Sequence, residues 1–263
     1  MDRLDKLLAH EGFGSRKDIK KMMRACEVLV NGKRILDPGF QVDTEKDEIV
    51  VDDEVITCQK QLYLMMNKPQ NTVSASKDGE HTTVFDLLDA KYRTEYLQDK
   101  LHLIGRLDLD TEGLLLFTTD GELTHRMISP KNEISKAYFM VLKEPLSVEQ
   151  RDSLIEIFAK GFEIPPEGHE PGFVSKPAVL SFPDDEETER ALTNSAISIV
   201  DAPANNRAIL SITEGKFHQV KRMWAAQGNE VVYLKRLSEG NLRLDETLSP
   251  GKTKEIARTD IEE

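Results

Sequence analysis

The stretch HLIGRLDLDTEGLLLFTTDGELTHRM, residues 102–127, holds two apolar runs separated by a short acidic segment. The second run, Leu114–Phe117, is of strand length, as is the run that precedes the acidic segment. Short apolar runs bounded by turn residues predict strands of a sheet. Asp108, Asp110 and Glu112 are therefore predicted to lie in a tight connection at the edge of that sheet.

Carboxylates at alternate positions also raise the possibility of a metal site. An EF-hand calcium loop would use these three acids and Gly113, but its twelfth position is Thr119, where a bidentate Glu is required. That mismatch argues against calcium. A metal-dependent phosphoryl-transfer enzyme stays open as an alternative, although the sequence offers no second acidic cluster or His at suitable spacing. On the residues alone, a turn or capping role for Asp108 is favoured.

Further β-like runs follow on both sides of this stretch and alternate irregularly with helical segments, so a regular βαβ repeat is absent. We expect an α+β fold with a mixed, largely antiparallel sheet and flanking helices. One helix is bounded by Ser147 as N-cap, with Gln150 as capping-box partner, and by Gly161 at its end. Residues 165–190, rich in Pro, Gly and acid, are predicted to form a loop. The predicted strands contain Leu62–Met66, Leu101–Ile104, Gly113–Thr118, Ala137–Leu142, Ala208–Ile212 and Val231–Lys235.

The first 57 residues are predicted to form a separate module of two helices and a hairpin. Ser15 stands where an N-cap is needed, and the apolar stripe of the second helix is Ile19, Met22, Met23 and Cys26. Asn31-Gly32 between two short apolar runs indicates a type I′ hairpin. The opposite face of the second helix carries Arg16, Lys17, Lys20, Lys21 and Arg24.

Charge is unevenly distributed along the chain. The 263 residues carry a net charge of -12, which by itself argues against a polyanion as partner. Residues 1–34, however, hold nine Lys and Arg against five Asp and Glu, and residues 215–236 hold five against one, so each segment is +4. Local patches decide where RNA can bind. No apolar run approaches the roughly 18 residues of a membrane span, and no secretory leader is evident, so we expect a cytoplasmic protein.

The N-terminal pattern RLDKLLAHEGFGSRKDIKKMMRACEVLVNGKRI, residues 3–35, resembles the S4 RNA-binding domain. This resemblance implies an S4-like domain over residues 1–57, then a linker at 58–61 and a catalytic domain over 62–263. In the S4 family the helix after the Ser-Arg pair and the hairpin form the RNA-facing surface. The residues expected on that surface are Arg3, Ser15, Arg16, Lys17, Lys20, Lys21, Arg24, Asn31 and Lys33.

The segment GRLDLDTEGLLLFTTDG, residues 105–121, resembles the signature of the RsuA-type pseudouridine synthases, in which the Asp of GRLD is catalytic. That resemblance assigns catalysis to Asp108. LYLMMNKPQNTVSA (62–75) and SKAYFMVL (135–142) are similar to further motifs of the family, and the second supplies Tyr138. EGKFHQVKRMWAAQGNEVVYLKR (214–236) resembles the motif whose basic residue, here Lys221, pairs with the catalytic Asp. Arg106, His218 and Arg222 are expected to bind substrate.

The resemblance implies isomerisation of uridine to pseudouridine without metal or other cofactor. The layout of the chain is most similar to the small-subunit enzymes, which implies uridine 516 of 16S ribosomal RNA, free or within a partially assembled small subunit, as the target. We expect the protein to be a monomer. Two alternatives remain: a synthase of the same family acting on 23S ribosomal RNA, and a non-catalytic RNA-binding factor of ribosome assembly.

Overall fold

The computed structural model describes residues 2–11, 13–43, 46–56, 61–93, 97 and 100–262. The chain divides into two compact units, Met1–Gln61 and Leu62–Glu263. Of the linker expected at 58–61, only Gln61 lies among the described residues. Within the described part, no helix is both long and apolar enough to cross a membrane.

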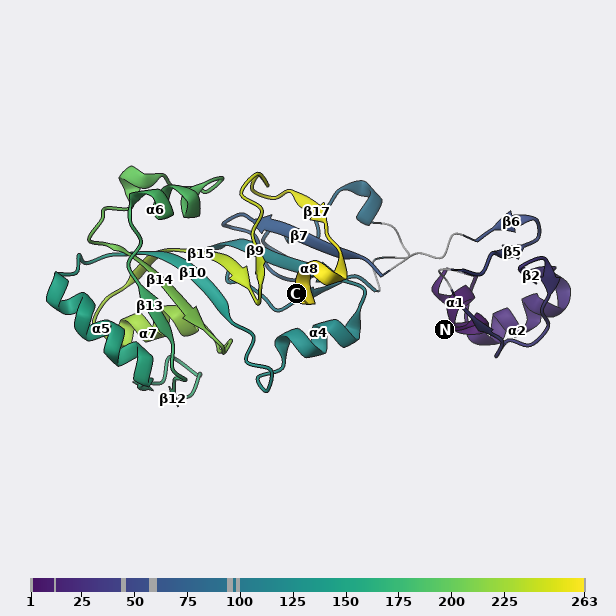
Figure 1. Ribbon diagram of the computed structural model, residues 1–263, viewed down its shortest axis with the longest axis horizontal. Coiled ribbons are helices and arrows are strands. Elements are labelled where there is room, and N and C mark those ends of the chain that lie inside the picture. Colours follow the sequence, from purple (N-terminus) through teal and green to yellow (C-terminus); the bar gives the residue numbers. More distant parts are fainter. Residues whose placement is uncertain are drawn as a thin grey trace. The chain divides into compact units, whose positions relative to one another are not determined.

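The N-terminal unit consists of two helices and short antiparallel strands (Figure 1). Its four-stranded sheet has the order β3-β2-β5-β6, and β1 pairs with β4. Side chains of α1, α2 and the sheet share one buried core that includes Leu8, Ile19 and Val28. The elements are β1 Asp2–Arg3, α1 Leu4–His10, α2 Arg16–Ala25, β2 Val28–Val30, β3 Lys33–Arg34, β4 Gln41–Val42, β5 Ile49–Val51 and β6 Glu54–Val55.

The predicted beginning of α2 and the predicted hairpin are both confirmed. Ser15 is the N-cap and forms a capping box with Asp18. Of the predicted apolar stripe, Ile19 and Met23 are fully buried, whereas Met22 and Cys26 are only partly covered. Asn31 and Gly32 have φ angles of 50° and 72°, as a type I′ turn between β2 and β3 requires.

The C-terminal unit is built on one sheet with the strand order β13-β14-β10-β15-β9-β7-β17 (Figure 1). The pair β15–β9 is parallel, and the other described pairs along this path are antiparallel. The expected α+β fold with a mixed, largely antiparallel sheet is confirmed. In addition, β8 pairs with β9 and β16 with β15. The first elements are β7 Tyr63–Lys68, η1 Ala90–Tyr92, β8 His102–Ile104, β9 Thr111–Thr118, α4 Gly121–Ile128, β10 Lys136–Leu142 and α5 Val148–Lys160. They are followed by β11 Glu163–Ile164, β12 Phe173–Val174, β13 Val179–Ser181, α6 Asp185–Leu192, η2 Ile199–Asp201, β14 Arg207–Ile212, α7 Gln219–Ala226, β15 Val231–Glu239, β16 Leu242–Arg243, β17 Thr253–Glu255 and α8 Arg258–Glu262.

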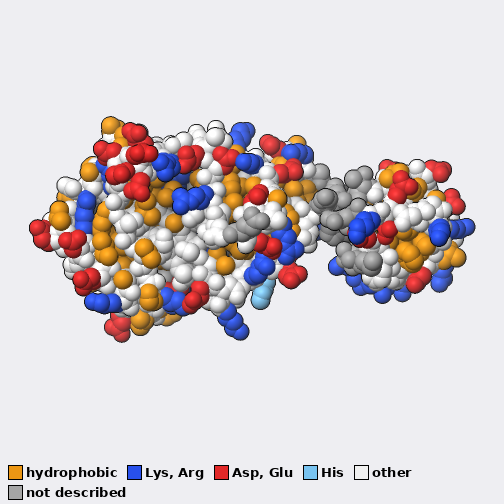
Figure 2. Space-filling model, viewed as in Figure 1, with side chains coloured by type: hydrophobic (Ala, Val, Ile, Leu, Met, Phe, Trp, Pro, Cys, Tyr) orange, Lys and Arg blue, Asp and Glu red, His pale blue; other side chains and the backbone are white. Residues whose placement is uncertain are grey.

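The prediction of a loop over residues 165–190 is wrong for much of the stretch after residue 172. That stretch contains β12, the edge strand β13 and most of α6. The acidic run predicted to be loop begins α6, because Asp184 is its N-cap and negative side chains are favourable in the first turn of a helix. Figure 2 shows these acidic side chains gathered over α6.

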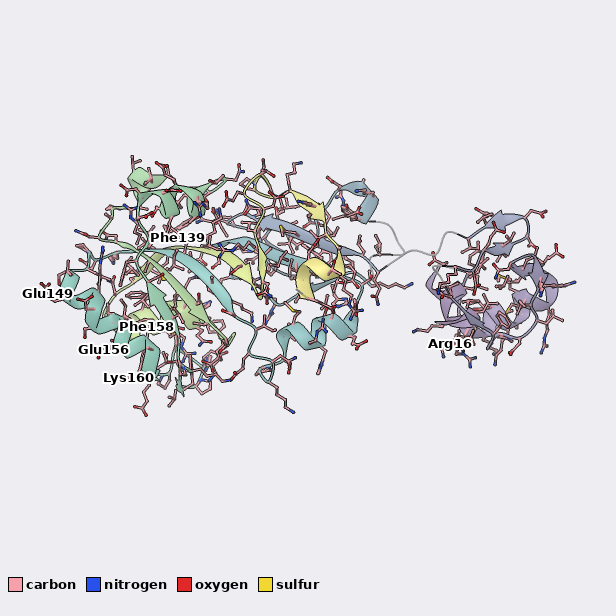
Figure 3. The ribbon with its side chains drawn as sticks, in the orientation of Figure 1. Arg16, Phe139, Glu149, Glu156, Phe158 and Lys160 are labelled. Atoms are coloured by element: carbon pink, nitrogen blue, oxygen red, sulfur yellow. The ribbon has the colours of Figure 1, made fainter. Side chains whose placement is uncertain are left out.

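Helices α5 and α7 bury aromatic side chains against each other. The rings of Phe158 and Trp224 have centroids 5.1 Å apart, and both side chains are fully buried. Figure 3 shows Phe158 directed inward from α5, while Glu149 and Lys160 point away. The predicted capping box of Ser147 and Gln150 begins this helix, as expected. This packing holds α7, and with it Lys221, against the sheet.

Candidate active site

Five of the six residues predicted to be functional in the C-terminal unit converge on a cavity of about 90 Å³. Asp108 reaches it from the loop between β8 and β9, Tyr138 from β10, and Lys221 from α7. Arg106 and His218 also line it. The complete lining is Arg106, Leu107, Asp108, Thr111, Tyr138, Ile212, Gly215, Lys216, His218, Gln219, Val220, Lys221 and Leu234.

Two cationic or ionisable groups face the Asp108 carboxylate. Lys221 Nζ lies 3.5 Å from Asp108 Oδ2, and His218 Nε2 lies 3.9 Å from Asp108 Oδ1. The ammonium is shared, because Lys221 Nζ also donates a hydrogen bond to Asp110 Oδ1 at 2.6 Å. Burial alone would raise the pKa of Asp110, but the Lys221 hydrogen bond and charge lower it overall. One ammonium thus serves two carboxylates, of which Asp108 lines the cavity.

The loop that carries Asp108 is held through hydrogen bonds to its main-chain carbonyl groups. Lys68 stands at the end of β7 with its side chain fully buried, and its ammonium points into the turn of the loop. Lys68 Nζ donates to the carbonyl oxygens of Pro69, Asp108, Leu109 and Thr111 at 3.1, 2.9, 3.3 and 2.8 Å. Since burial disfavours its charged form, the pKa of Lys68 falls to about 8.

The segment after β7 adds two further anchors to the same loop. The Ser74 hydroxyl donates to the Leu107 carbonyl at 2.7 Å and accepts from the Leu107 N–H at 3.1 Å. The Asn71 N–H donates to the Leu109 carbonyl at 2.8 Å. Asp108 therefore lies between two residues whose carbonyls are held, which fixes where its carboxylate can point.

Comparison with known proteins shows the family to which the chain belongs. The model of the RNA pseudouridylate synthase family matches residues 62–226, and the S4 domain model matches residues 2–49. The chain belongs to the RNA pseudouridylate synthase family. Its N-terminal unit is an S4 domain, and the C-terminal unit is called the synthase domain below.

Relatives match along nearly the whole chain. An uncharacterized RNA pseudouridine synthase of Bacillus subtilis is 40% identical, with 98% of this chain and 96% of the relative covered. The ribosomal small subunit pseudouridine synthase A of Haemophilus influenzae is 35% identical, covering 99% and 98%. The enzyme of the same name in Escherichia coli is also 35% identical, covering 98% of each. A crystal structure of a pseudouridylate synthase has a TM-score of 0.60 at 33% identity and covers 100% of this chain and 99% of its own.

The prediction for Glu112 is wrong. It does not lie in the connection with Asp108 and Asp110 but within β9, where its side chain is buried. Its carboxylate accepts hydrogen bonds from the Tyr233 hydroxyl at 2.6 Å and from the Ala196 N–H at 3.2 Å. Among the described residues, no three His, Cys, Asp or Glu side chains form a group able to hold a metal ion. The triad invoked for the phosphoryl-transfer alternative is therefore not assembled.

Arg222, expected to bind substrate, is directed away from the Asp108 cavity. Its guanidinium is almost fully buried and donates to the carbonyls of Pro165 and Pro171 at 2.9 and 2.8 Å. The guanidinium also lies over the Phe173 ring, 4.8 Å from its centroid. Successive residues on a helix point about 100° apart, and here Lys221 lines the cavity while Arg222 is directed to the Pro165 and Pro171 carbonyls. Arg222 fixes the loop between β11 and β12.

His218 holds an unusual backbone conformation beside Asp108. It is the N-cap of α7 with a φ of 48°, in the left-handed region that non-glycine residues seldom occupy. Its ring stacks on Phe217 with centroids 3.7 Å apart. Backbone strain of this kind clusters at functional sites.

An ion pair beneath Tyr138 was not foreseen from the sequence. Arg236 and Glu239 are both fully buried, with Arg236 Nη2 lying 3.3 Å from Glu239 Oε2. Burial raises the pKa of the Tyr138 phenol, while the Arg236 charge acts in the opposite direction. Gly113 is required nearby, because a Cβ there would lie 2.2 Å from the Arg236 carbonyl oxygen. This contact joins β9 to β15 and explains one glycine of the 105–121 segment.

Asp120, also within that segment, has a structural role. Its carboxylate accepts from the Glu122 and Leu123 N–H groups at 3.1 and 3.0 Å, so it caps α4. The Tyr63 hydroxyl donates to its other oxygen at 2.9 Å. Within the 105–121 segment, Asp120 is thus the residue that caps a helix.

In the S4 domain, the predicted RNA-facing residues differ in how they are held. Arg3 and Asn31 bond to acidic neighbours, Arg3 to Asp5 at 2.8 Å and Asn31 to Asp47 at 2.8 Å. Ser15 is engaged in its capping box. The predicted cationic side chains of α2 and the Lys33 side chain are instead exposed to solvent, and Figure 3 shows Arg16 at this surface. The exposed cations on this face are Arg16, Lys17, Lys20, Lys21 and Arg24.

Proposed function

We propose that this protein isomerises a uridine of ribosomal RNA to pseudouridine with Asp108 as its catalytic carboxylate. The observation that carries the proposal is the position of Asp108, one third exposed at a cavity, beside the Lys221 ammonium and on a loop whose carbonyls are anchored. A positioned, ionised carboxylate next to a cation is what this reaction requires.

The reaction breaks the bond between uracil N1 and ribose C1′, rotates the base and forms a bond from C5 to C1′. A proton leaves C5 and N1 gains one, so the atoms balance without redox change. Asp108 acts on the ribose, as nucleophile at carbon or as base toward a ribose proton, and both roles need its anionic form. Lys221 places its positive charge 3.5 Å from the Asp108 carboxylate.

Other cavity residues have supporting roles. Tyr138 contacts the uracil ring, because its side chain is buried in the cavity wall with its phenol kept neutral by burial. Arg106 is exposed at the start of the same loop and contacts the RNA backbone or fills the position that the base vacates. The target uridine must leave its stack, since its glycosidic bond is otherwise out of reach.

The S4 domain supplies RNA affinity. Five exposed cations on one helix are suited to phosphates, which contribute most of the affinity of non-specific RNA binding. Because the whole chain is acidic, binding away from this face and the Asp108 cavity is weak.

The target we propose is uridine 516 of 16S ribosomal RNA, within the cytoplasm, in free RNA or a partially assembled small subunit. Support comes from the layout of the motifs and from relatives named ribosomal small subunit pseudouridine synthase A at 35% identity over nearly the full length.

The test is to incubate the purified protein, without added cofactor, with 16S ribosomal RNA, with partially assembled small subunits and, separately, with 23S ribosomal RNA. Pseudouridine is then mapped by carbodiimide blockage of reverse transcription. A single new stop at uridine 516 is the expected result. A stop only in 23S ribosomal RNA would show that the target uridine lies there. No stop on any of these substrates would favour a non-catalytic assembly factor. Loss of activity with EDTA on prefolded RNA would favour metal-dependent chemistry.

A further inference from the structure

A second cavity, of about 220 Å³, adjoins the Asp108 cavity in the synthase domain. The two share Arg106, Tyr138, Gly215 and Lys216 in their linings. Beyond these shared residues, its walls come from Gly105, the end of α4, the start of β10 and the chain before it, the loop before β13, the chain after β14 and the buried side chains of β15. None of these walls has a role in the isomerisation as proposed above.

The lining of this second cavity is cationic. It includes the cations Arg106, Lys136, Lys176, Lys216 and Arg236 and the carboxylates Glu214 and Glu239, which gives a net charge of +3 in a chain of net charge -12. Such a local excess in an acidic protein favours an anionic occupant.

Two of these cations are available to a phosphate. The Lys176 and Lys216 side chains are 39% and 41% exposed. Lys176 Nζ lies 2.8 Å from Glu133 Oε1 and Lys216 Nζ lies 3.7 Å from Glu214 Oε1. Ion pairs at such exposure contribute little free energy, so an incoming phosphate can compete for both ammonium groups.

Much of the remaining lining is apolar and suits the flat face of a base. Met127 is buried, Ile134 is partly buried, and Ile128 is 50% exposed at the end of α4. Apolar contact for a base beside cations for a phosphate is the combination that single-stranded nucleic acid requires.

We propose that this second cavity holds the nucleotide adjacent to the target uridine. The inference rests on the proposed function: when the uridine enters the Asp108 cavity, its neighbour stays covalently attached and must be accommodated beside it. Its base lies against the end of α4, and its phosphate contacts Lys176 and Lys216. The site therefore selects for an RNA strand whose neighbouring nucleotide can also leave its stack.

The experiment compares Lys176→Ala with Lys143→Ala on the RNA that the unaltered protein modifies. Lys143 is a matched control, since its ammonium forms an exposed ion pair with Glu230 at 2.7 Å and lines neither cavity. We expect Lys176→Ala to raise KM about fivefold with kcat unchanged, and to reduce the slope of log KM against log salt by about 0.7. Lys143→Ala should leave both unchanged.

A second arm uses RNA in which the nucleotide on one side of the target uridine is abasic. We expect a raised KM when the base is removed from the nucleotide on one side of the target uridine. Removal of the base from a nucleotide two positions away should leave KM unchanged. Equal KM for all of these RNAs, or equal KM and salt slope for the two variants, would overturn the inference while leaving the proposed function intact. A neighbour effect without a Lys176 effect would place that nucleotide outside this cavity. An unaltered protein without activity on any ribosomal RNA would overturn both proposals.

Discussion

The loop that carries Asp108 and the basic face of α2 both present charged side chains, but they hold them in opposite ways. In the loop, a buried ammonium and a hydroxyl hold the carbonyls on both sides of Asp108. On α2, the cations extend into solvent from a helix whose other face is buried. Figure 2 shows Lys and Arg side chains at the rim of the S4 domain. Chemistry depends on a fixed carboxylate, whereas attraction of phosphates depends on charge and tolerates mobile side chains.

Apart from changes to Asp108 itself, we expect the largest effect on activity when the Lys68 ammonium, which holds the loop that carries Asp108, is removed. We expect Lys68→Met to lower kcat about 100-fold, because four carbonyls lose their shared donor and the Asp108 carboxylate shifts from its position. Steady-state kinetics with a fixed RNA substrate measure the change. Lys235→Met is the control, since Lys235 is equally buried but donates to Thr193 and Ser195, which do not line the cavity. Equal kcat for the two variants would remove the anchoring role.

The S4 face should give a smaller effect of a different kind. Changing Lys17, Lys20 and Lys21 to Ala is expected to weaken RNA binding about tenfold and to reduce the salt slope by about 2, because three phosphate contacts are lost. At saturating RNA, kcat should stay the same. Filter binding at several salt concentrations checks this, with Lys160→Ala on α5 as an exposed control. An unchanged slope in the triple variant would take RNA binding away from α2.

A change of pH should affect kcat and the free energy of unfolding in opposite directions through Lys68. Burial lowers the pKa of Lys68 to about 8 from its ordinary 10.5. Between these values the folded state binds fewer protons than the unfolded state, so this group raises the free energy of unfolding as pH rises. The neutral amine nevertheless has fewer hydrogens for the carbonyls it holds. We therefore expect kcat to fall severalfold as pH passes about 8, without a loss of stability from this group.

The measurement is a kcat profile between about pH 6 and pH 10 beside thermal denaturation at each pH. Burial also lowers the pKa of Lys235 to about 8, so Lys235→Met tests which lysine is responsible. The fall should persist in Lys235→Met. Its disappearance there would assign the pH effect to Lys235 instead.

Much of the fold could be predicted because local signals and burial agreed. The N-cap at Ser15, the capping box at Ser147 and the Asn31-Gly32 turn depend on neighbours in sequence, and all three are present. The prediction for Glu112 is wrong because alternating acids do not reveal where a strand begins. β9 starts at Thr111 and buries the Glu112 side chain. Hydrogen bonds to Tyr233 and Ala196 make that burial possible, and both partners are distant in sequence.

The anchoring role of Lys68 could not be predicted from the sequence for a similar reason. Lys68 follows an apolar strand, and a Lys at a strand end is ordinarily taken for a surface residue. Its role depends on four carbonyls, three of them about forty residues later in the chain. The convergence of Asp108, Tyr138 and Lys221 was expected only from the family resemblance, since spacing alone does not bring a loop, a strand and a helix together.

The most direct test of the division between chemistry and docking is Asp108→Asn, assayed for both pseudouridine formation and RNA affinity. The change keeps the shape of the side chain and the anchored loop but removes the charge beside Lys221. We predict that no pseudouridine forms under single-turnover conditions while the Kd for RNA stays within about twofold of the unaltered protein. Pseudouridine formation by Asp108→Asn, or a loss of RNA affinity that accounts for the lost activity, would contradict the assignment of catalysis to Asp108.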